Sequence, residues 1–438
     1  MNYFNYIKLA MLIFILFPLL PGQSDYEKWL KEQQREMSQI IEDENNYMAS
    51  VTKQFDQYKN EQERLYKQFK EEVEKKWDSF RFSSPTEYVD YDNDLSARAA
   101  IDFENGVVEI EVLIEDVDAG LKDNQDGAPL IDKKDQKYEG KQSQKSKLVI
   151  EDQKNLTSNK AQRTTMDTKN QKVVEDKQYK EAQVKLQKKL KQISTKRARD
   201  NKPILKDQLQ TKSGKKVTNK NVSNFVKIAI QSQKLDLTKI LSKDGKKRVK
   251  YTAKVYMPPD HLDKRAERFR AEVIKQSERF EIDPAIAFAI MHTESSFNPN
   301  ARSHIPAFGL MQLVPSSGAR DAYNYVYKKD KLLEGKYLYN PANNIELGCA
   351  YIRKIRYEYF KGIKDEEAAY FCTISAYNTG IGNVARTFTG STKLKPAVAK
   401  INQRNADQVY QFLLKNLPYD ETKNYLVKVT DRIDLYQK

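Results

Sequence analysis

The chain has 438 residues, with 76 lysines and arginines against 61 aspartates and glutamates, and a formal net charge of +15. A chain of this length can hold two or three domains and bury a substantial core. Its charge predicts a long-range, salt-sensitive attraction to polyanions, which include nucleic acid and cell wall, so charge alone does not identify a partner. It contains only three histidines, and none has ligand spacing with the two cysteines, so we expect no metal site and no other cofactor.

The first residues have the pattern of a signal peptide. Lys8 precedes an apolar run over residues 9–20, and the small residues Gly22 and Ser24 follow. The run is roughly a dozen residues long, well short of the ~20 that a membrane-spanning helix needs. We therefore predict an exported protein whose signal is cleaved after Ser24.

Residues 25–81 carry apolar side chains at steps of three, four and seven, which predicts a long helix or a helical hairpin. The stripe fits a coiled-coil seam and, equally, burial against the next domain; it comprises Leu30, Met37, Ile41, Met48, Val51, Phe55, Tyr58, Leu65, Phe69, Val73, Trp77 and Phe80. Residues 98–115 have a β-hairpin pattern with the turn at Asn105-Gly106. We interpret residues 25–117 as a helical segment and the start of an α+β domain.

Residues 118–221 are rich in Lys, Gln, Asp and Asn, and only two aromatic residues lie between Phe103 and Phe225. Such a stretch is expected to build little core. We predict a basic insertion or linker over residues 118–221, which is flexible over residues 118–180 and contains a charged helix over residues 181–196. The remaining strands of the N-terminal domain are predicted to follow, over residues 222–261. Because no aromatic residues are interleaved with the lysines, a solvated tether or a loose electrostatic hold on the wall is favoured over nucleic-acid binding.

The C-terminal part, residues 262–438, is predicted to be mainly helical, with helices over residues 264–280, 284–295, 315–327, 344–360, 365–378, 405–416 and 418–436. The second of these is too apolar for a surface helix, and Asn298-Pro299 should end it, so Glu294 lies near a buried helix terminus. Burial disfavours a charged carboxylate and raises its pKa, as a proton donor near neutral pH requires. Many helical glutamates are only solvated or capping, which is the alternative for Glu294.

Three motifs follow Glu294 in order: Ser303, then Gly309-Leu310-Met311-Gln312, and then Ala376-Tyr377-Asn378-Thr379-Gly380. Together they resemble the catalytic domain of the soluble lytic transglycosylases, a family with a lysozyme-like fold that cleaves peptidoglycan. The resemblance covers residues 262 to 437. Upstream, residues 259–266, 88–91 and 98–106 are similar to the membrane-bound lytic transglycosylase C branch of that family.

The resemblance implies an α+β chain, in which a mainly α-helical, lysozyme-like catalytic domain follows a smaller α+β domain. It implies cleavage of the β-1,4 bond between N-acetylmuramic acid and N-acetylglucosamine in peptidoglycan glycan strands, for cell-wall remodelling or turnover. It also implies a periplasmic location, with association with the cell wall or the outer membrane as a further alternative. Glu294 would donate a proton and then, as a base, take the proton of the C6 hydroxyl that attacks C1, so that a 1,6-anhydromuramoyl end forms without water. Asp283 and Asp321 lie outside the matching motifs, which favours a single acid over the two carboxylates of ordinary glycosidases. The alternatives are a lysozyme-type peptidoglycan hydrolase and a non-enzymatic wall-binding scaffold.

The resemblance also assigns substrate-binding positions, namely Ser295, Ser303, Gly309, Met311, Gln312, Tyr377, Asn378, Glu421 and Tyr425. Glycine at position 309 permits a tight backbone path beside the substrate. Several of the other positions also have a purely structural interpretation: Met311 as core filler, Tyr377 and Tyr425 as packed aromatics, Asn378 as a helix end and Glu421 as an acid in the first turn of a helix.

The chain departs from the family at two places. Members usually carry a lipid-modified cysteine just after the signal, whereas the only cysteines here are Cys349 and Cys372, so the lipid anchor is not expected. Adjacent antiparallel helices could join these two in a disulfide contributing ~3 kcal/mol, or both could be buried thiols in the core. Asn340 precedes Pro341 where the family often has aspartate, which we interpret as a difference in turn or helix capping.

Overall fold

The computed structural model describes residues 23–116, 146–303 and 307–437. It divides the chain into two units, one ending at Glu61 and one beginning at Gln62, and the sheet and the C-terminal helices all belong to the second. The predicted signal peptide lies outside the described residues except for Gln23 and Ser24, which begin the first described helix. None of the described helices is long and apolar enough to cross a membrane.

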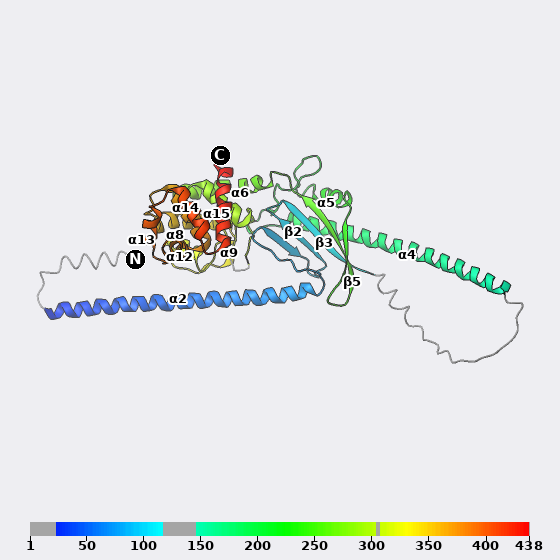
Figure 1. Cartoon of the computed structure of the whole chain (residues 1–438), viewed down its shortest axis with the longest axis horizontal. Coiled ribbons are helices and arrows are strands. Elements are labelled where there is room, and N and C mark those ends of the chain that lie inside the picture. The colour runs from blue at the N-terminus through cyan, green and yellow to red at the C-terminus, as the bar shows by residue number, and fades with distance from the viewer. Residues whose placement is uncertain (1–22, 117–145, 304–306, 438) are drawn as a thin grey trace, which may run out of the picture. The chain divides into compact units, whose positions relative to one another are not determined.

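The helix predicted from the first apolar stripe is α2 (Gln23–Glu74), a continuous helix of 52 residues rather than a helical hairpin (Figure 1). Near its C-terminal end, Val73 is fully buried and packs with Trp77, which follows the helix, against Leu113 of the sheet. This end of the stripe is therefore explained by burial against the next domain.

A five-stranded antiparallel sheet forms the N-terminal domain, with the strand order β1-β2-β3-β5-β4. The strands are β1 (Glu87–Tyr91), β2 (Ala97–Asp102), β3 (Val107–Glu115), β4 (Asp236–Leu241) and β5 (Lys247–Tyr256). The predicted hairpin is confirmed, because Asp102 pairs with Val107 across its turn. In that turn Gly106 has φ +66°, and a Cβ there would lie 2.6 Å from the ring of His261. Only glycine fits this backbone and this close approach.

The segment predicted to be a flexible linker is helical wherever the structure describes it up to residue 195. Helix α4 (Ser146–Thr195) begins well before the expected charged helix, and its C-terminal part buries Leu186, Leu190 and Ile193 against the sheet. These side chains recur every three or four residues, which suffices for one apolar helix face although the mean composition is polar. The prediction of little core was therefore wrong for this part; residues 117–145 lie outside the described residues.

The prediction of strands from residue 222 onward was also wrong at its start, where the structure has helix α5 (Val222–Gln231). Its buried side chains are Val222, Phe225, Val226 and Ile230. β-Branched and aromatic residues favour a strand locally, but this spacing places all four on one helix face against the sheet core. Strands β4 and β5 follow, as expected.

The C-terminal domain is mainly helical. Its elements are α6 (His261–Phe280), α7 (Pro284–Ser295), α8 (Gly318–Tyr327), α9 (Gly335–Leu338), α10 (Pro341–Lys354), π-helix η1 (Ile355–Tyr359), α11 (Glu366–Thr379), α12 (Ile381–Thr389), α13 (Leu394–Ile401), α14 (Ala406–Asn416), α15 (Asp420–Ile433) and the 3-10 helix η2 (Asp434–Tyr436). All seven predicted helices are present near their expected bounds. Helices α9, α12 and α13 are short and were not predicted from the sequence. The α+β fold class is confirmed.

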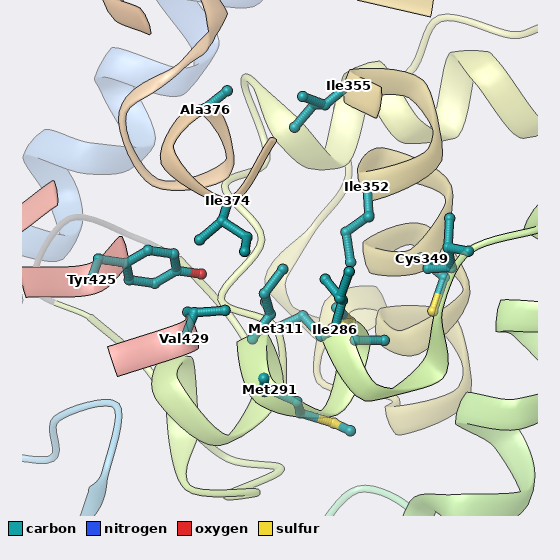
Figure 2. Close-up of a cluster of buried hydrophobic side chains, with 14 of the residues drawn as sticks. Ile286, Met291, Met311, Cys349, Ile352, Ile355, Ile374, Ala376, Tyr425 and Val429 are labelled. Atoms are coloured by element: carbon teal, nitrogen blue, oxygen red, sulfur yellow. The ribbon is translucent and has the colours of Figure 1, made fainter. Parts of the chain in front are cut away.

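One apolar core runs through this domain, and Figure 2 shows part of it, with Met311 and Cys349 among its buried side chains. Both Cys349 and Cys372 are buried and free, so the thiol alternative holds and the disulfide is absent. Asn340 caps α10, since its side-chain oxygen accepts the N–H of Ala342 at 3.0 Å. The interpretation of this asparagine as a cap is confirmed.

Candidate active site

Helix α7 fixes the position of Glu294. It begins at the cap Asp283, whose carboxylate accepts the N–H of Ala285 at 2.8 Å, with Pro284 in the first turn. Every residue from 285 to 292 is buried, so the helix cannot move without disturbing the core. It ends where Ser296 adopts a left-handed backbone with φ +47°. Glu294 thus lies on the last turn of a helix held at both ends.

The carboxyl of Glu294 has the electrostatics of a proton donor. Burial raises its pKa to about 8, the charge of Glu421 adds to the rise, and a hydrogen bond from Tyr425 opposes it. The Tyr425 hydroxyl donates to Glu294 Oε1 at 2.8 Å. Glu294 nevertheless keeps partial exposure, so solvent or a substrate can reach it. At neutral pH the group is therefore mostly protonated, as predicted from the apolar helix.

Asp283 and Asp321, the two other carboxylates near Glu294 in the sequence, have structural contacts away from it. Asp283 caps the opposite end of α7, roughly 16 Å away along the helix axis. Asp321 accepts from the Lys354 ammonium and from the Tyr359 hydroxyl. Glu421 is exposed in the first turn of α15 and acts on Glu294 through its charge. The arrangement therefore provides one partly buried acid, Glu294, and none of these other candidates is paired with it as a second buried carboxylate.

The loop at residues 307–313 is held beside Glu294 by a buried asparagine that sequence reasoning missed. Gly309 has φ +76°, and a Cβ there would lie 2.6 Å from the carbonyl of Leu338. Asn344, fully buried on α10, accepts the N–H of Met311 at 2.8 Å and donates to the carbonyl of Phe308 at 2.8 Å. A polar residue on the apolar face of a helix was the available signal.

Two predicted substrate-binding residues are anchored to the backbone of this loop. Ser295 is fully buried, and its hydroxyl donates to the carbonyls of Leu310 at 2.7 Å and Met291 at 3.0 Å. Gln312 has φ +44°, and its Nε2 donates to the carbonyl of Gly309 at 2.9 Å. Its Oε1 is buried and has no hydrogen-bond donor within the part of the chain that the structure describes. Such an acceptor is costly unless a ligand or water satisfies it.

Helices α11 and α15 complete the site. The Tyr377 hydroxyl donates to the carbonyl of Met311 at 2.9 Å, and the side chain of Met311 is itself fully buried (Figure 2). Asn378 Oδ1 accepts from Thr422 Oγ1 at 2.7 Å, which ties the end of α11 to α15 beside Glu421. Ser303 precedes the Gly309 loop in the chain, and its Oγ accepts the N–H of Ala307 at 3.2 Å.

Two family models match the chain. Residues 272–399 match the model described as Transglycosylase SLT domain, and residues 48–124 match the model described as Membrane-bound lytic murein transglycosylase C, N-terminal domain. Residues 272–399 are therefore similar to SLT transglycosylase domains, and residues 261–437 are called the SLT domain below. The resemblance inferred from the sequence motifs is confirmed.

Curated relatives carry the name membrane-bound lytic murein transglycosylase C. The Klebsiella pneumoniae protein is 38% identical over 201 residues, which are 46% of this chain and 55% of the relative. The Haemophilus influenzae protein is 36% identical over 228 residues, which are 52% of this chain and 62% of the relative. The matched part of the chain thus spans somewhat over half the length of these relatives.

Solved structures also match. The 70 kDa soluble lytic transglycosylase SLT70 from Escherichia coli is 23% identical, with a TM-score of 0.30 over 41% of this chain and 25% of that one. Lytic transglycosylase Slt from Pseudomonas aeruginosa is 25% identical, with a TM-score of 0.28 over 38% and 23%.

The N-terminal domain contacts the SLT domain directly behind Glu294. Glu104, in the turn between β2 and β3, accepts from the Ser296 hydroxyl and, at 2.5 Å, from Arg432 Nη2. Arg432 Nη1 in turn donates to Thr293 Oγ1 at 3.2 Å. The residue before Glu294 and the second residue after it are therefore both tied to one carboxylate of the other domain.

A second side chain strengthens this junction. Arg265 on α6 is fully buried and donates to the carbonyl of Ser296 at 2.9 Å and to the carbonyl of Phe103 in the same hairpin turn. A left-handed serine costs of order 1 kcal/mol, and these contacts hold it in place. Glu104, Arg265 and Arg432 were not predicted from the sequence, because each reaches the end of α7 from a distant part of the chain.

Proposed function

We propose that this protein is a lytic transglycosylase that cleaves the β-1,4 bond between N-acetylmuramic acid and N-acetylglucosamine in peptidoglycan and leaves a 1,6-anhydromuramoyl end. One observation carries the proposal: the Glu294 carboxyl, whose pKa burial raises to about 8, lies at the end of a rigid apolar helix within hydrogen-bond distance of Tyr425. The matched SLT domain and the names of the curated relatives support the same substrate class.

In the first step, protonated Glu294 donates its proton to the glycosidic oxygen as the bond from that oxygen to C1 of the muramic acid breaks. The Tyr425 hydroxyl stays on Oε1 and stabilises the carboxylate that remains. Burial and the Glu294 carboxyl raise the pKa of Tyr425, so its hydroxyl remains a donor throughout. The positive charge that develops at C1 is stabilised by the acetamido group of the substrate itself.

In the second step, the carboxylate takes the proton of the C6 hydroxyl while O6 attacks C1. One carbon–oxygen bond has broken and one has formed, Glu294 is protonated again, and no water is consumed. These two steps require a single carboxyl group with a moderately raised pKa, because the same group must release a proton and then regain it. Neither Asp283 nor Asp321 is placed to supply a second catalytic carboxylate.

The neighbouring positions are proposed to bind the sugar. Buried Gln312 Oε1 has no donor among the described residues, and the N–H of a substrate acetamido group would satisfy it. Tyr377, Met311 and Gly309 shape the loop around it, as does Ser295 through its bond to Leu310. Ser303, Asn378 and Glu421 are proposed to extend the contact along the glycan.

The substrate implies a location outside the cytoplasm. We infer that residues 1–24 direct export, that residues 262–438 act as the catalytic domain on the cell wall and that the excess of basic residues favours wall association. The name of the curated relatives, membrane-bound, supports a wall-facing and membrane-proximal position.

The test is mass spectrometry of soluble muropeptides released from purified sacculi by the protein and by its Glu294→Gln variant. Anhydro ends released by the wild type and absent with the variant are expected. Reducing ends, heavier by one water, would replace the proposal with a lysozyme-type hydrolase. No release by either protein would favour a wall-binding scaffold.

A further inference from the structure

A hollow of about 500 Å³ lies between the sheet domain and the SLT domain, and its lining residues are different from those of the candidate active site. Segments far apart in the chain form it: residues 82–88, the turn that follows α4, residues 300–302 and Tyr339. Its lining residues are Phe82, Ser83, Tyr88, Lys196, Arg197, Ala198, Arg199, Asn300, Arg302 and Tyr339.

The charge of this hollow is one-sided. Four cations line it and no carboxylate does, whereas a hollow elsewhere on the sheet domain mixes Lys185 and Lys189 with Asp92 and Asp94. Lys196 is compensated by an ion pair with Asp90 at 2.8 Å. Arg197, Arg199 and Arg302 have no carboxylate of the described residues within salt-bridge distance, and Arg302 donates instead to the neutral amide of Gln62 at 2.7 Å.

The cationic turn is a rigid platform. Arg197 pairs with Pro203 in an isolated antiparallel bridge, the N–H of Ala198 donates to the carbonyl of Lys202 at 2.9 Å, and Ala198 is buried in the core of the sheet domain. Asp200, the acid nearest in sequence, points to Arg268 at 2.6 Å and does not neutralise the arginines. Because the backbone of this turn is already ordered, only the exposed arginine side chains must be fixed when a carboxylate binds.

The hollow and the active site share one piece of backbone. Arg302 pairs with Phe308, and the N–H of Gly309 donates to the carbonyl of Ala301 at 2.9 Å. The ring of Tyr339 packs edge-on against Phe308 with centroids 5.3 Å apart. A ligand that contacts Arg302 and Tyr339 in the hollow therefore touches two residues that pair or pack with Phe308, the neighbour of Gly309.

We propose that this hollow binds the carboxylates of a peptidoglycan stem peptide while the glycan to which it is attached lies at Glu294; the inference rests on the proposed function. A stem peptide of four or five residues reaches at most ~17 Å from its sugar, so its acids can extend beyond the glycan site. The guanidinium groups of Arg197, Arg199 and Arg302 match carboxylates in charge and in fork geometry. The hollow thus makes the enzyme prefer glycan that still carries its peptides.

The test compares two substrates, peptide-bearing glycan strands and the same strands freed of peptides by an amidase. For the full chain we expect kcat/KM about tenfold higher on the peptide-bearing strands, and a preference near one for the double variant Arg197→Gln with Arg199→Gln. A double variant with the same loss of charge on exposed lysines of the sheet domain, Lys227→Gln with Lys234→Gln, should keep the preference.

Two further arms separate the possible failures. Peptide-bearing strands whose free carboxylates have been amidated should be cleaved at the rate of the peptide-free strands. If wild-type protein cleaves both substrates equally, or if the arginine variant slows both equally, the stem-peptide proposal is overturned while the transglycosylase assignment stands. If neither substrate yields anhydro ends, the proposed function itself fails.

Discussion

Replacing Glu294 with glutamine should stabilise the protein, and by an amount that depends on pH. The structure raises the pKa of this carboxyl from an ordinary 4.5 to about 8. Below both values the group is protonated in the folded and unfolded chains, and its ionisation has no effect on stability. As the pH rises from 4.5 to about 8, the unfolded chain loses the proton first, so the folded state becomes progressively less stable.

The magnitude follows from the pKa difference. At ~1.4 kcal/mol per unit, burying the ionisable carboxyl costs roughly 5 kcal/mol once it is ionised in both states, and roughly 3 kcal/mol at pH 7. Glutamine has nearly the same shape and no such cost. The free energy of unfolding of the Glu294→Gln variant should therefore exceed that of the wild type by an amount that grows up to about pH 8 and is then constant.

Urea unfolding of the full chain, followed by circular dichroism at closely spaced pH values, measures this difference. Tryptophan fluorescence is the wrong probe, because Trp29 and Trp77 both lie outside the SLT domain. Glu421→Gln is the control, because it removes an exposed charge that helps raise the pKa of Glu294. In this variant, the loss of unfolding free energy between pH 4.5 and about 8 should be slightly smaller than in the wild type. A stability difference between Glu294→Gln and wild type that does not change with pH would refute the reasoning.

Three further predictions concern the surroundings of the acid. Tyr425→Phe removes the donor that lowers the pKa of Glu294, so the alkaline limb of the kcat/KM profile should move to higher pH while the maximal rate falls; an unmoved limb would contradict this. Glu104→Gln should lower kcat roughly tenfold with little change in KM, because it loosens the backbone on both sides of the acid. Gly309→Ala should lower stability by roughly 3 kcal/mol in thermal unfolding, against about 1 kcal/mol for Gly390→Ala, which has the same left-handed backbone but nothing within 4 Å of the added Cβ.

The Glu104 prediction has a matched control on the same hairpin. Glu109 on β3 pairs with Arg81 and Lys254, so Glu109→Gln loosens the sheet domain without touching α7. If Glu109→Gln lowers kcat as much as Glu104→Gln does, the effect reflects general destabilisation and not the position of Glu294. A normal pH profile with reduced kcat in the Glu104 variant is the expected signature of a positioning residue.

The sequence by itself determined the local features of the site. The apolar run of residues 284–291, with Asn298-Pro299 expected to end the helix, placed Glu294 near a buried helix terminus, and the structure has α7 end at Ser295 with a raised pKa for the acid. The Asn105-Gly106 turn and the helix cap at Asn340 were likewise predicted from the sequence. These features depend on neighbours within a few residues, so chain pattern and local chemistry suffice to predict them.

Only the tertiary structure decided what closes around the acid. The burial of Leu186, Leu190 and Ile193 is set by the sheet they cover, and a polar composition concealed this helix face. Glu104 reaches Ser296, and Tyr425 reaches Glu294, across well over a hundred residues of chain. A pattern of spacing carries no information about which distant side chain fills the remaining hydrogen-bonding position. That choice is made when distant segments pack, within the SLT domain for Tyr425 and between the two domains for Glu104, because buried donors and acceptors must then find partners.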